Sequence, residues 1–487
     1  MPPTGWLIDR SIQHEYWPLA AGKRLYITAR LGMALLRWNR QSSLVLVVLI
    51  AAFALSGWQM LSPEPAPDFA FVSPIPGEAV NKLPPQSQPA SVAKPESGAK
   101  DSNKNLTFQS RFVSSSPGQA VHAPSVVELR NGDLRAVWFS GSREGARDVT
   151  IQSSVMDKET LRWSSETTLF ERHRIEHGLM RYVKKIGNPV IWRGPSGDLY
   201  LWMVNVSLGG WAGSSISWAR SADEGVSWTA PRRLVTSPFL NISTLVKGAP
   251  FAFANGQIGL PVYHEFVTKL GEMLRLDDQG RVIDKVRIPA SHTSLQPVTL
   301  VTGAREAQVF MRSGDAIALM TSETRDAGLT WSPTRRTDVN NPDSALAGLV
   351  SRDARRWLAL NPNSGDRETL SLAVLNPGAS LRKDSLHPLE KSPSAAARLE
   401  TEPYLDLLRR ELTAHGVSNA DATAYLASAK RQLCGETRCW QEFSYPYLLQ
   451  SRDGHIHLVY TWHRTRIKHI RLDPSQPGLI HDVPGLN

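Results

Sequence analysis

Two carboxylates stand four residues apart in the glycine-flanked segment SREGARD. Glu144 and Asp148 could act there as a general acid and a general base, because two carboxyl groups in different surroundings can divide those roles. Three basic side chains elsewhere, those of His122, Lys185 and Arg312, could bind an anionic group of the same substrate. Plain structural interpretations also exist, since Glu144 could be a solvated loop charge and Asp148 could cap the following strand.

The other residues that often bind metals do not stand at metal-site spacing. The chain has only two cysteines, Cys434 and Cys439 in CGETRC, and no further ligands stand near them as a zinc site requires. In an exported protein such a pair favours a local disulfide over two free thiols. His455, His457 and His469 alternate along expected strands and indicate a polar sheet face. We therefore expect no metal and no cofactor.

The formal net charge of +10 does not indicate a nucleic-acid partner, because the Lys and Arg residues are scattered among acidic ones. Six basic residues do cluster before residue 41, ahead of an uncharged stretch from Gln41 to Pro63. This pattern predicts a cytoplasmic N-terminus at 1–42 and a single-pass anchor in the bacterial inner membrane at 43–60. The body would then be periplasmic. A cleavable signal peptide ending near Ala52-Phe53-Ala54 is the alternative.

Residues 61–105 are rich in Pro, Ser and Ala and lack apolar periodicity, so we expect a poorly ordered, extended linker. Residues 106–487 form the body. A turn motif occurs twice in it, in RSADEGVSW around Asp223 and in TRDAGLTW around Asp326. The Asp can accept backbone N–H groups, the Gly two positions later can take a positive φ, and the Trp opens the next strand. A degenerate third copy, SVMDKETLRW, ends at Trp163.

Strand-rich segments in the body surround tight turns at NG, SGD or DG, which predicts β-hairpins. They are VVELRNGDLRAVWFSG, NPVIWRGPSGDLYLWMV, PFAFANGQIGLPVYH and YLLQSRDGHIHLVYTW. The two Asp turns lie 103 residues apart, which fits two propeller blades of roughly 40–50 residues each. We therefore expect an all-β fold, a six-bladed β-propeller. One exception is a helical insertion at about 395–433, where Gly416 suits a helix C-terminus and Ser418 or Asn419 an N-cap.

The repeated turn resembles the Asp-box, or BNR, repeat of the sialidase superfamily, over about residues 110–472. The segments HAPSVVELRNGDLRAVWFSGSREGARDVTI, GNPVIW, NPDSALAGL and EFSYPYLLQSRDGHIHLVYTW are similar to a sialidase-like branch from bacteria and plants. This resemblance implies that the Asp-boxes build the blades and lie away from the active site. Retaining sialidases use three arginines for the substrate carboxylate, an Asp acid/base, and a Tyr nucleophile paired with a Glu, an exception to the usual two carboxylates.

Carried over by position, the resemblance gives a mixed site. His122, in His122-Ala123-Pro124, stands where the family has its first arginine. Glu144, with Asp148 just beyond, stands at the acid/base position, and Gln296 in SLQPVTL stands where the family has the Glu partner. Arg312 in VFMRSGD matches the second arginine.

Tyr445 in FSYP matches the nucleophile, with Phe443 or Tyr447 as alternative alignments. The third arginine is not clear from the sequence, and either Arg464 or Arg466 could turn inward. His264, with Glu265 beside it, follows a strand and could also contact substrate.

Two of these positions differ from the family in ways that matter chemically. His122 cannot form the bidentate fork of an arginine with a carboxylate, and Gln296 cannot take a proton from Tyr445. We therefore expect a membrane-anchored periplasmic glycoside hydrolase that acts on terminal, acidic sugars of envelope or surface glycans, with sialic acid not the best substrate. The alternative is a non-catalytic propeller that binds glycan or scaffolds an assembly. A uronate lyase that uses His122 and Tyr445 is a minor third option.

Overall fold

The computed structural model describes residues 40–61, 66–71, 109–237, 241–363, 366–391 and 398–474, in two compact units that divide between Pro65 and Ala66. In the first unit, helix α2 spans Arg40–Leu61. Within the described ranges, no helix combines the length and the apolar character needed to cross a membrane. The anchor predicted at 43–60 is not confirmed, and the predicted cytoplasmic segment before Arg40 lies outside the described residues.

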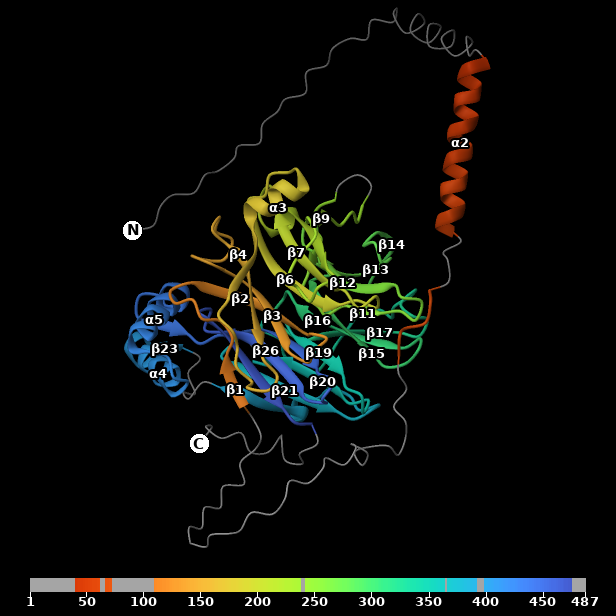
Figure 1. Ribbon diagram of the computed structural model, residues 1–487. Coiled ribbons are helices and arrows are strands. Elements are labelled where there is room, and N and C mark those ends of the chain that lie inside the picture. The colour runs from red at the N-terminus through yellow and green to blue at the C-terminus, as the bar shows by residue number, and fades with distance from the viewer. Residues whose placement is uncertain are drawn as a thin grey trace, which may run out of the picture. The chain divides into compact units, whose positions relative to one another are not determined.

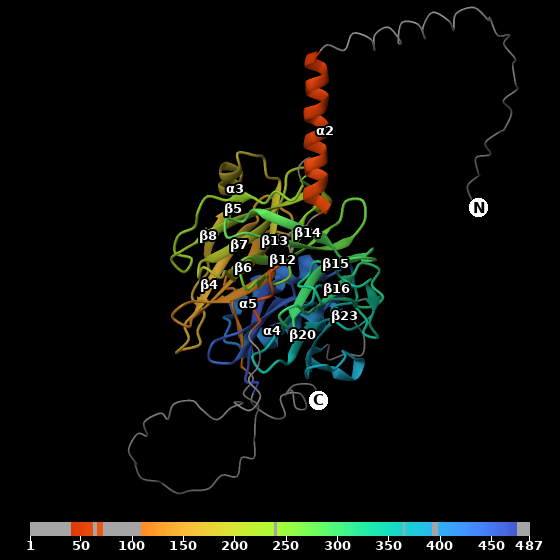
Figure 2. The ribbon, with the colours of Figure 1, turned by 90° about the vertical axis from the view of Figure 1, so that its right-hand side faces the viewer.

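The second unit is a six-bladed β-propeller, as predicted (Figures 1 and 2). Blade 1 contains β2 (Ala120–Glu128), β3 (Leu134–Gly141), β4 (Thr150–Met156) and β5 (Thr167–Glu171). Blade 2 contains β6 (Lys185–Arg193), β7 (Leu199–Val206), β8 (Ser214–Ser221) and β9 (Arg232–Arg233). Blade 3 contains β10 (Leu245–Val246), β11 (Phe251–Ala252), β12 (Ile258–His264), β13 (Leu270–Leu276) and β14 (Val282–Arg287).

Blade 4 contains β15 (Ser294–Val301), β16 (Ala307–Ser313), β17 (Met320–Thr324) and β18 (Arg335–Arg336). Blade 5 contains β19 (Ala347–Val350), β20 (Arg356–Leu360), β21 (Thr369–Leu375) and β22 (Leu386–Lys391). Blade 6 contains β25 (Phe443–Gln450), β26 (Ile456–Trp462), β27 (Arg466–Leu472) and, as its outer strand, β1 (Gln109–Phe112). All strand pairs in the blades are antiparallel.

The blades form a closed ring around the first strand of each sheet. The inner strand β2 contacts β6 on one side and β25 on the other, and β15 and β19 continue the series. In blade 3 the inner strand is split into β10 and β11, which both pair with β12. Burial follows this arrangement: every residue of β7 is buried between two neighbouring blades, whereas the outer strand β14 alternates between half-buried and exposed residues.

The predicted Asp turns connect the third and fourth strands of their blades. Asp223 accepts hydrogen bonds from the backbone N–H of Ser227 at 2.9 Å and from the hydroxyls of Ser227 and Ser221 at 2.6 and 2.7 Å. Asp326 accepts from the N–H of Thr330 at 2.9 Å in the same way. Gly225 and Gly328 have φ of 85° and 86°, a conformation in which other residues are strained. The turns therefore hold the third and fourth strands of their blades together, as the sequence predicts.

Residues 66–71 fall in the predicted linker but pack on blades 3 and 4, which corrects that part of the prediction. Phe69 is 2% exposed and its N–H donates to Ala304 O at 2.7 Å. Its ring lies 5.3 to 5.4 Å from those of Phe251 and Phe253. The segment packs there because Phe69 buries its apolar ring in a small aromatic cluster. The Pro-rich composition does not reveal this cluster. The remainder of the predicted linker up to residue 105 lies outside the described residues, except 61.

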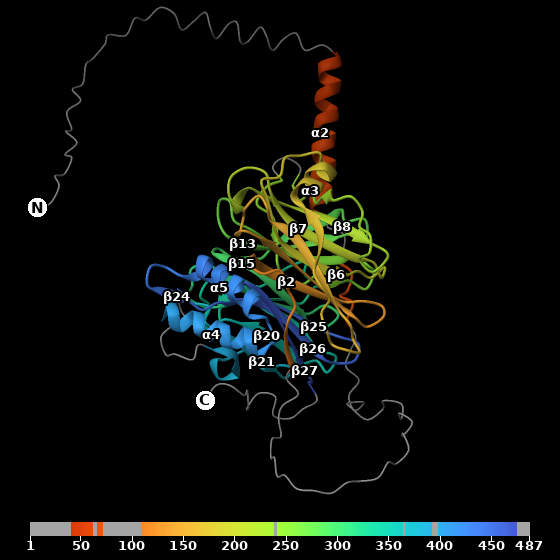
Figure 3. The ribbon, with the colours of Figure 1, turned by 60° about the vertical axis from the view of Figure 1, so that its left-hand side comes forward.

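The predicted helical insertion is confirmed as α4 (Thr401–Ala414) and α5 (Asn419–Leu433), which lie side by side at one edge of the propeller (Figure 3). Ser418 is the N-cap of α5 and accepts from Asp421 N–H. Two short strands, β23 (Arg398–Glu400) and β24 (Arg438–Trp440), pair at the base of the insertion. Cys434 and Cys439 form the expected disulfide there. The structure also contains α3 (Arg172–Leu179) and two 3-10 turns, η1 (Trp211–Gly213) and η2 (Lys383–Ser385), which the sequence patterns did not indicate.

Candidate functional site

Four inner strands share one irregularity near their first residues. In β2, β6, β15 and β25 the strand register shifts at a bulge, and the bulged residue precedes a proline and has positive φ. The four bulged residues are Ala123 (φ 53°), Asn188 (41°), Gln296 (50°) and Tyr445 (54°). Such backbone is strained for these residues and persists where the surrounding structure enforces it, which is typical of functional sites. The bulges therefore mark one end of the propeller axis as a candidate site.

Tyr445 lies at the centre of this end of the axis. Its hydroxyl oxygen accepts a hydrogen bond from Gln296 Nε2 at 3.1 Å and another from Arg312 Nη1 at 3.2 Å. The ring of His122 lies 4.2 Å from the ring of Tyr445, measured between centroids. The structure thus brings together four of the predicted residues from blades 1, 4 and 6.

Gln296 is buried and acts as a connector. Its Oε1 accepts from Arg312 Nη1 at 3.0 Å, and its Nε2 also lies 3.4 Å from the hydroxyl of Tyr263. Tyr263, whose pKa burial raises well above the usual value, is 3.4 Å from Asn188 Nδ2 as well. A neutral amide at position 296 holds the two phenols in place but cannot serve as a base.

His122 is uncharged in this setting. Burial lowers its pKa well below the usual value, and the positive charge of Arg464 lowers it further. Its Nδ1 is buried and has no hydrogen-bond partner in the described part of the chain. A buried ring nitrogen of this kind is costly unless something bonds to it, so His122 is available to a substrate hydroxyl or to a proton.

Three arginines lie at this end of the axis, and carboxylates hold all three. Arg312 Nε contacts Asp343 Oδ1 at 2.6 Å. Arg367, whose guanidinium carbon lies 5.9 Å from the centre of the Tyr445 ring, contacts Glu442 Oε1 at 3.2 Å. Arg464 Nε contacts the other oxygen of Glu442 at 2.8 Å. A substrate anion would therefore compete with carboxylates that are already in place.

Glu442 is the buried centre of this charge network. Burial opposes its ionisation, but the positive charges of Arg464 and Arg367 outweigh that effect and hold its pKa well below the usual value. The hydroxyl of Ser444 donates to Glu442 Oε1 at 2.6 Å. Glu442 thus stays ionised and positions both arginines. The sequence analysis did not single out Glu442 or Arg367.

Glu144 joins the network at its edge. Its Oε2 accepts from Arg464 Nη1 at 2.9 Å, and its side chain is 38% exposed, so a substrate can reach it. Lys185 lies near Glu144, whose charge partly offsets the lowering of the Lys185 pKa by burial, and its Nζ sits 4.2 Å over the Trp211 ring. Both predicted residues are therefore connected to the site, at its rim.

Asp148 does not join the cluster. Its two carboxylate oxygens accept from the N–H and the hydroxyl of Ser142, at 2.9 and 3.0 Å, so it closes the loop that carries Glu144. The structural interpretation holds for this residue, because both of its oxygens are bound within the loop. Its assignment as a second acid or base stays a prediction.

His264 also lies apart from the cluster, since the charges that act on it are those of Glu272, Lys285 and Arg287 on the neighbouring strands. The next residue, Glu265, is the one that approaches the site. Burial raises the pKa of Glu265, and the charge of Arg312 opposes that rise. The predicted contact of His264 with substrate stays a prediction.

The structure resolves the alternatives at two positions. Phe443 packs against His463, with ring centroids 4.9 Å apart, and the hydroxyl of Tyr447 donates to Ile191 O at 3.5 Å, so Tyr445 alone of the three occupies the cluster. Arg466 lies over the rings of Phe112 and Tyr425, at 4.3 and 4.4 Å, on the outer side of the blade. Arg464 is therefore the arginine that turns toward the site.

Lys247 is a further residue that sequence reasoning missed. It follows β10, is 2% exposed, and its Nζ donates to Pro446 O at 3.0 Å. Burial lowers its pKa to about 7, and no carboxylate pairs with it in the described part of the chain. It lies beside the ring of Tyr445, at 5.8 Å from the centroid, and adds positive charge beneath the phenol at neutral or lower pH.

One signal in the sequence could have located this end of the axis. The tripeptides HAP, GNP, LQP and SYP each place a residue before a proline at the start of an inner strand. Their recurrence in four blades marks the bulges. Arg367 and Lys247 have no such signal, because only the closure of the ring brings them to Tyr445. Within the described residues, no group of three or more His, Cys, Asp or Glu side chains is arranged to hold a metal ion.

The comparisons with known proteins agree with this architecture. The profile of the family described as BNR repeat-like domain matches residues 132–458. A search of curated proteins found no match. The solved structure of the Hadza microbial sialidase Hz136 has a TM-score of 0.54 and 13% identity, over 73% of this chain and 66% of that one.

Two further solved structures are similar over almost their whole length. The intramolecular trans-sialidase from Ruminococcus gnavus, solved with oseltamivir carboxylate, has a TM-score of 0.51 and 11% identity, over 77% of this chain and 97% of that one. A protein of unknown function from Dyadobacter fermentans has a TM-score of 0.51 and 12% identity, over 75% and 99%. At such identities the similarity concerns the fold.

Proposed function

The chain belongs to the family of BNR repeat-like domains, and on that premise we propose that it is a sialidase-like glycoside hydrolase that acts on terminal, acidic sugars of envelope or surface glycans. The observation that carries the proposal is the Tyr445 hydroxyl, which Arg312 and Gln296 hold at the propeller axis beside His122. A phenol oxygen beside a fixed guanidinium is suited to attack an anomeric carbon, because the positive charge stabilises developing negative charge on that oxygen.

In the proposed reaction, Glu144 gives a proton to the glycosidic oxygen as the bond from that oxygen to the sugar breaks. The Tyr445 oxygen forms a bond to the anomeric carbon, and its proton passes to the free nitrogen of His122. Water then attacks the same carbon and gives a proton to Glu144, while Tyr445 is released and recovers its proton from His122. Each group returns to its starting state.

The environment of the arginines bears on the choice of sugar. Asp343 and Glu442 already neutralise them, and His122 replaces one arginine of the sialidase pattern. A substrate carboxylate would gain from Arg312 only by displacing the 35%-exposed side chain of Asp343. Because His122 stands where the sialidase pattern has its first arginine, we propose that sialosides are poorer substrates than other acidic glycosides.

The experiment is a hydrolysis screen of chromogenic glycosides of sialic acid, uronic acids and neutral sugars. With the substrate that reacts, Tyr445→Phe should abolish turnover, and Glu144→Gln should lower kcat by roughly 10²–10⁴-fold. Asp148→Asn is the matched control in the same loop and should leave kcat within a few-fold. Equal losses in the Glu144 and Asp148 variants would show that the loop, and not Glu144, is required. Efficient cleavage of α-sialosides would refute the proposed sugar preference.

A second candidate is a non-catalytic glycan-binding propeller. It is favoured by Gln296, which leaves Tyr445 without a carboxylate base, and by the carboxylates that occupy all three arginines. Glycan binding without hydrolysis of any glycoside in the screen would support it. A uronate lyase would instead release an unsaturated product, which ultraviolet absorbance detects.

We also propose a periplasmic location behind a membrane anchor at residues 43–60. This proposal rests on the basic N-terminal residues and the uncharged stretch that follows them. The disulfide between Cys434 and Cys439 supports an oxidising compartment.

A further inference from the structure

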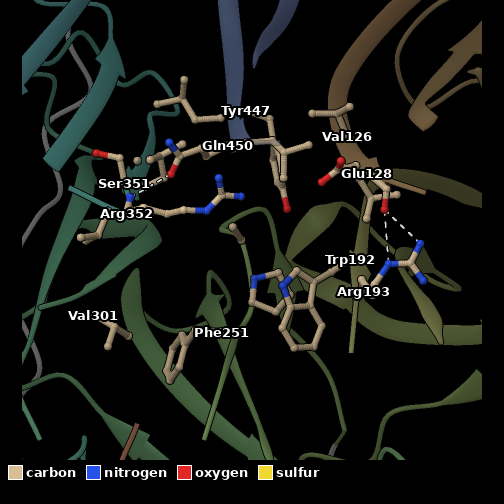
Figure 4. Close-up of a pocket in the computed structure, with 18 of the residues that line it drawn as sticks. Val126, Glu128, Trp192, Arg193, Phe251, Val301, Ser351, Arg352, Tyr447 and Gln450 are labelled. Carbon is tan, nitrogen blue, oxygen red and sulfur yellow. Dashed lines mark hydrogen bonds between the residues drawn. The ribbon is translucent and has the colours of Figure 1, made fainter. Parts of the chain in front are cut away.

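A cavity of about 640 Å³ opens at the end of the inner strands opposite to Tyr445 (Figure 4). Residues from the inner part of all six blades line it, because the inner strands run toward this end. None of His122, Gln296, Arg312 or Tyr445 is among its lining residues. The cavity is therefore distinct from the candidate site described above.

One part of the cavity wall is aromatic and apolar. Trp192 of β6 and Phe251 of β11 are both half-buried and present free surface to the cavity, with Val301 beside them. Figure 4 shows these three side chains on one side of the space. A flat aromatic surface in a concave site is a platform for the apolar C–H face of a sugar ring.

The opposite part of the wall is polar. Figure 4 shows Arg352, Tyr447 and Gln450 across the space from Trp192 and Phe251. Gln450 Oε1 accepts from the N–H of Arg352 at 2.9 Å, which fixes the two residues relative to each other. Gln450 Nε2 donates to Gly454 O at 3.0 Å, so Gln450 braces Arg352. The Tyr447 hydroxyl donates to Ile191 O and can still accept a hydrogen bond from a sugar hydroxyl, while the aromatic wall supplies contact area.

The cavity carries an excess of positive charge. Four arginines line it, Arg130, Arg193, Arg352 and Arg452, against the single carboxylate of Glu128. Arg452 pairs with Glu128 at 3.1 Å, and Arg193 and Arg130 pair with Glu224 at 2.6 and 2.8 Å.

Arg352 is the exception among the four. In the described part of the chain it has no carboxylate partner, and its Nη1 and Nη2 donate only to backbone carbonyls, Arg452 O at 3.0 Å and Ser451 O at 2.9 Å. Those carbonyls hold the guanidinium at the cavity wall without neutralising it. Because arginine stays charged at any ordinary pH, this position favours an anion.

From these features we propose that the cavity binds one acidic sugar unit of a glycan chain. The sugar ring would lie on Trp192, and its carboxylate would meet Arg352. The cavity volume is within the range of small-molecule sites and exceeds the size of one sugar. This second site is separate from the cluster at Tyr445 and does not depend on catalysis there.

The test measures binding of tetragalacturonate by the full-length chain in detergent, by calorimetry, with neutral cellotetraose as the comparison ligand. The Tyr445→Phe background prevents turnover. Tetragalacturonate should bind, and more weakly as salt rises, whereas cellotetraose should bind at least tenfold more weakly. Arg352→Gln should lower the affinity for tetragalacturonate about tenfold or more, and Trp192→Ala should remove most of the remaining binding.

Two control variants distinguish binding in the cavity from binding elsewhere on the propeller. Arg335→Gln removes a 65%-exposed arginine on blade 4, outside this cavity, and should leave the affinity unchanged. Glu144→Gln alters the candidate site at Tyr445 and should leave unchanged the part of the affinity that depends on Arg352 and Trp192. Binding that is lost with Glu144→Gln but kept with Arg352→Gln would place the glycan at Tyr445 and overturn the proposal. Equal affinity for the neutral oligosaccharide, or no binding of tetragalacturonate at millimolar concentration, would also overturn it.

Discussion

Replacing Glu442 by glutamine would remove the negative charge that Arg367 and Arg464 share. The side chain is 9% exposed, and the substitution keeps its shape. Arg367 would then keep its hydrogen bond to the backbone carbonyl of Asp343, at 3.0 Å, but would lose its ion pair with position 442. Arg464 would keep Glu144 at 2.9 Å. The two positively charged guanidinium groups would remain close together without the negative charge that they now share.

The expected cost follows from that arrangement. Breaking a buried ion pair by removing one partner costs about 3–5 kcal/mol. Glu144 is 38% exposed, so its pairing with Arg464 offsets less than about 1 kcal/mol of this loss. We expect a net loss of about 3 kcal/mol. With an unfolding entropy near 2.1 cal/mol/K per residue and a folded body of roughly 400 residues, this corresponds to a fall in Tm of about 4 °C.

The pH dependence gives a second, sharper signature. The pKa of Glu442 is lowered in the folded protein relative to 4.5, so its stabilisation is present above about pH 4.5 and is lost as pH falls toward the folded pKa. The Tm difference between wild type and Glu442→Gln should be largest near pH 7 and should shrink below pH 4.5. Differential scanning calorimetry at several pH values measures both effects.

The matched control is Glu323→Gln. Glu323 contacts Arg335 at 2.7 Å, but their side chains are 39% and 65% exposed, so this substitution should lower Tm by less than about 1 °C. The reasoning is refuted if Glu442→Gln shifts Tm no more than the control does. A shift that is the same at pH 7 and at about pH 2 would show that the loss comes from packing and not from charge.

Three further predictions concern other parts of the chain. Asp326→Ala should lower Tm in calorimetry, because the turn loses its bonds to the Thr330 N–H and hydroxyl. Turnover and binding at Tyr445, at the opposite end of the propeller axis, should be unchanged. Replacing Cys434 and Cys439 by serine should cost about 2 kcal/mol in chemical unfolding, the value expected for so short a loop. A reporter that is active only after export, fused after residue 487, should give signal, and signal from a cytoplasmic reporter instead would refute the proposed location.

The fold was predictable because its signals are local. The turns around Asp223 and Asp326 need only residues that are close in sequence, and their spacing indicates the length of a blade. Helices α4 and α5 were equally predictable from the sequence, since Ser418 caps the second helix and Gly416 follows the first with a φ of 76°. The packing of Phe69 was not predictable from the sequence, because its partners Phe251 and Phe253 lie far along the chain.

The site was predictable only where a residue had a counterpart in a known family. His122, Gln296, Arg312 and Tyr445 meet as expected, although their catalytic roles stay predictions. Arg367 and Lys247 were missed because blades 5 and 3 bring them to Tyr445, and no spacing in the sequence reports that distance. Glu442 stands only three residues before Tyr445, but its role depends on Arg367 and Arg464, which come from elsewhere in the chain. Asp148 was assigned a role through its proximity to Glu144, whereas its bonds to Ser142 were a local alternative that the sequence could not exclude.

The outer strand of blade 6 constrains the order in which the propeller can be completed. Residues Gln109–Phe112 are synthesised before the other blade strands. They pair with β27, the last strand in the sequence, through partners such as Arg111 and His469. This strand has no partner while blades 1 to 5 are synthesised. It is only four residues long and contains Gln, Ser and Arg, features that discourage an open strand from pairing with another chain. A chain that stops before β27 would leave β1 without its partner and blade 6 without its two outer strands, so the ring would stay open.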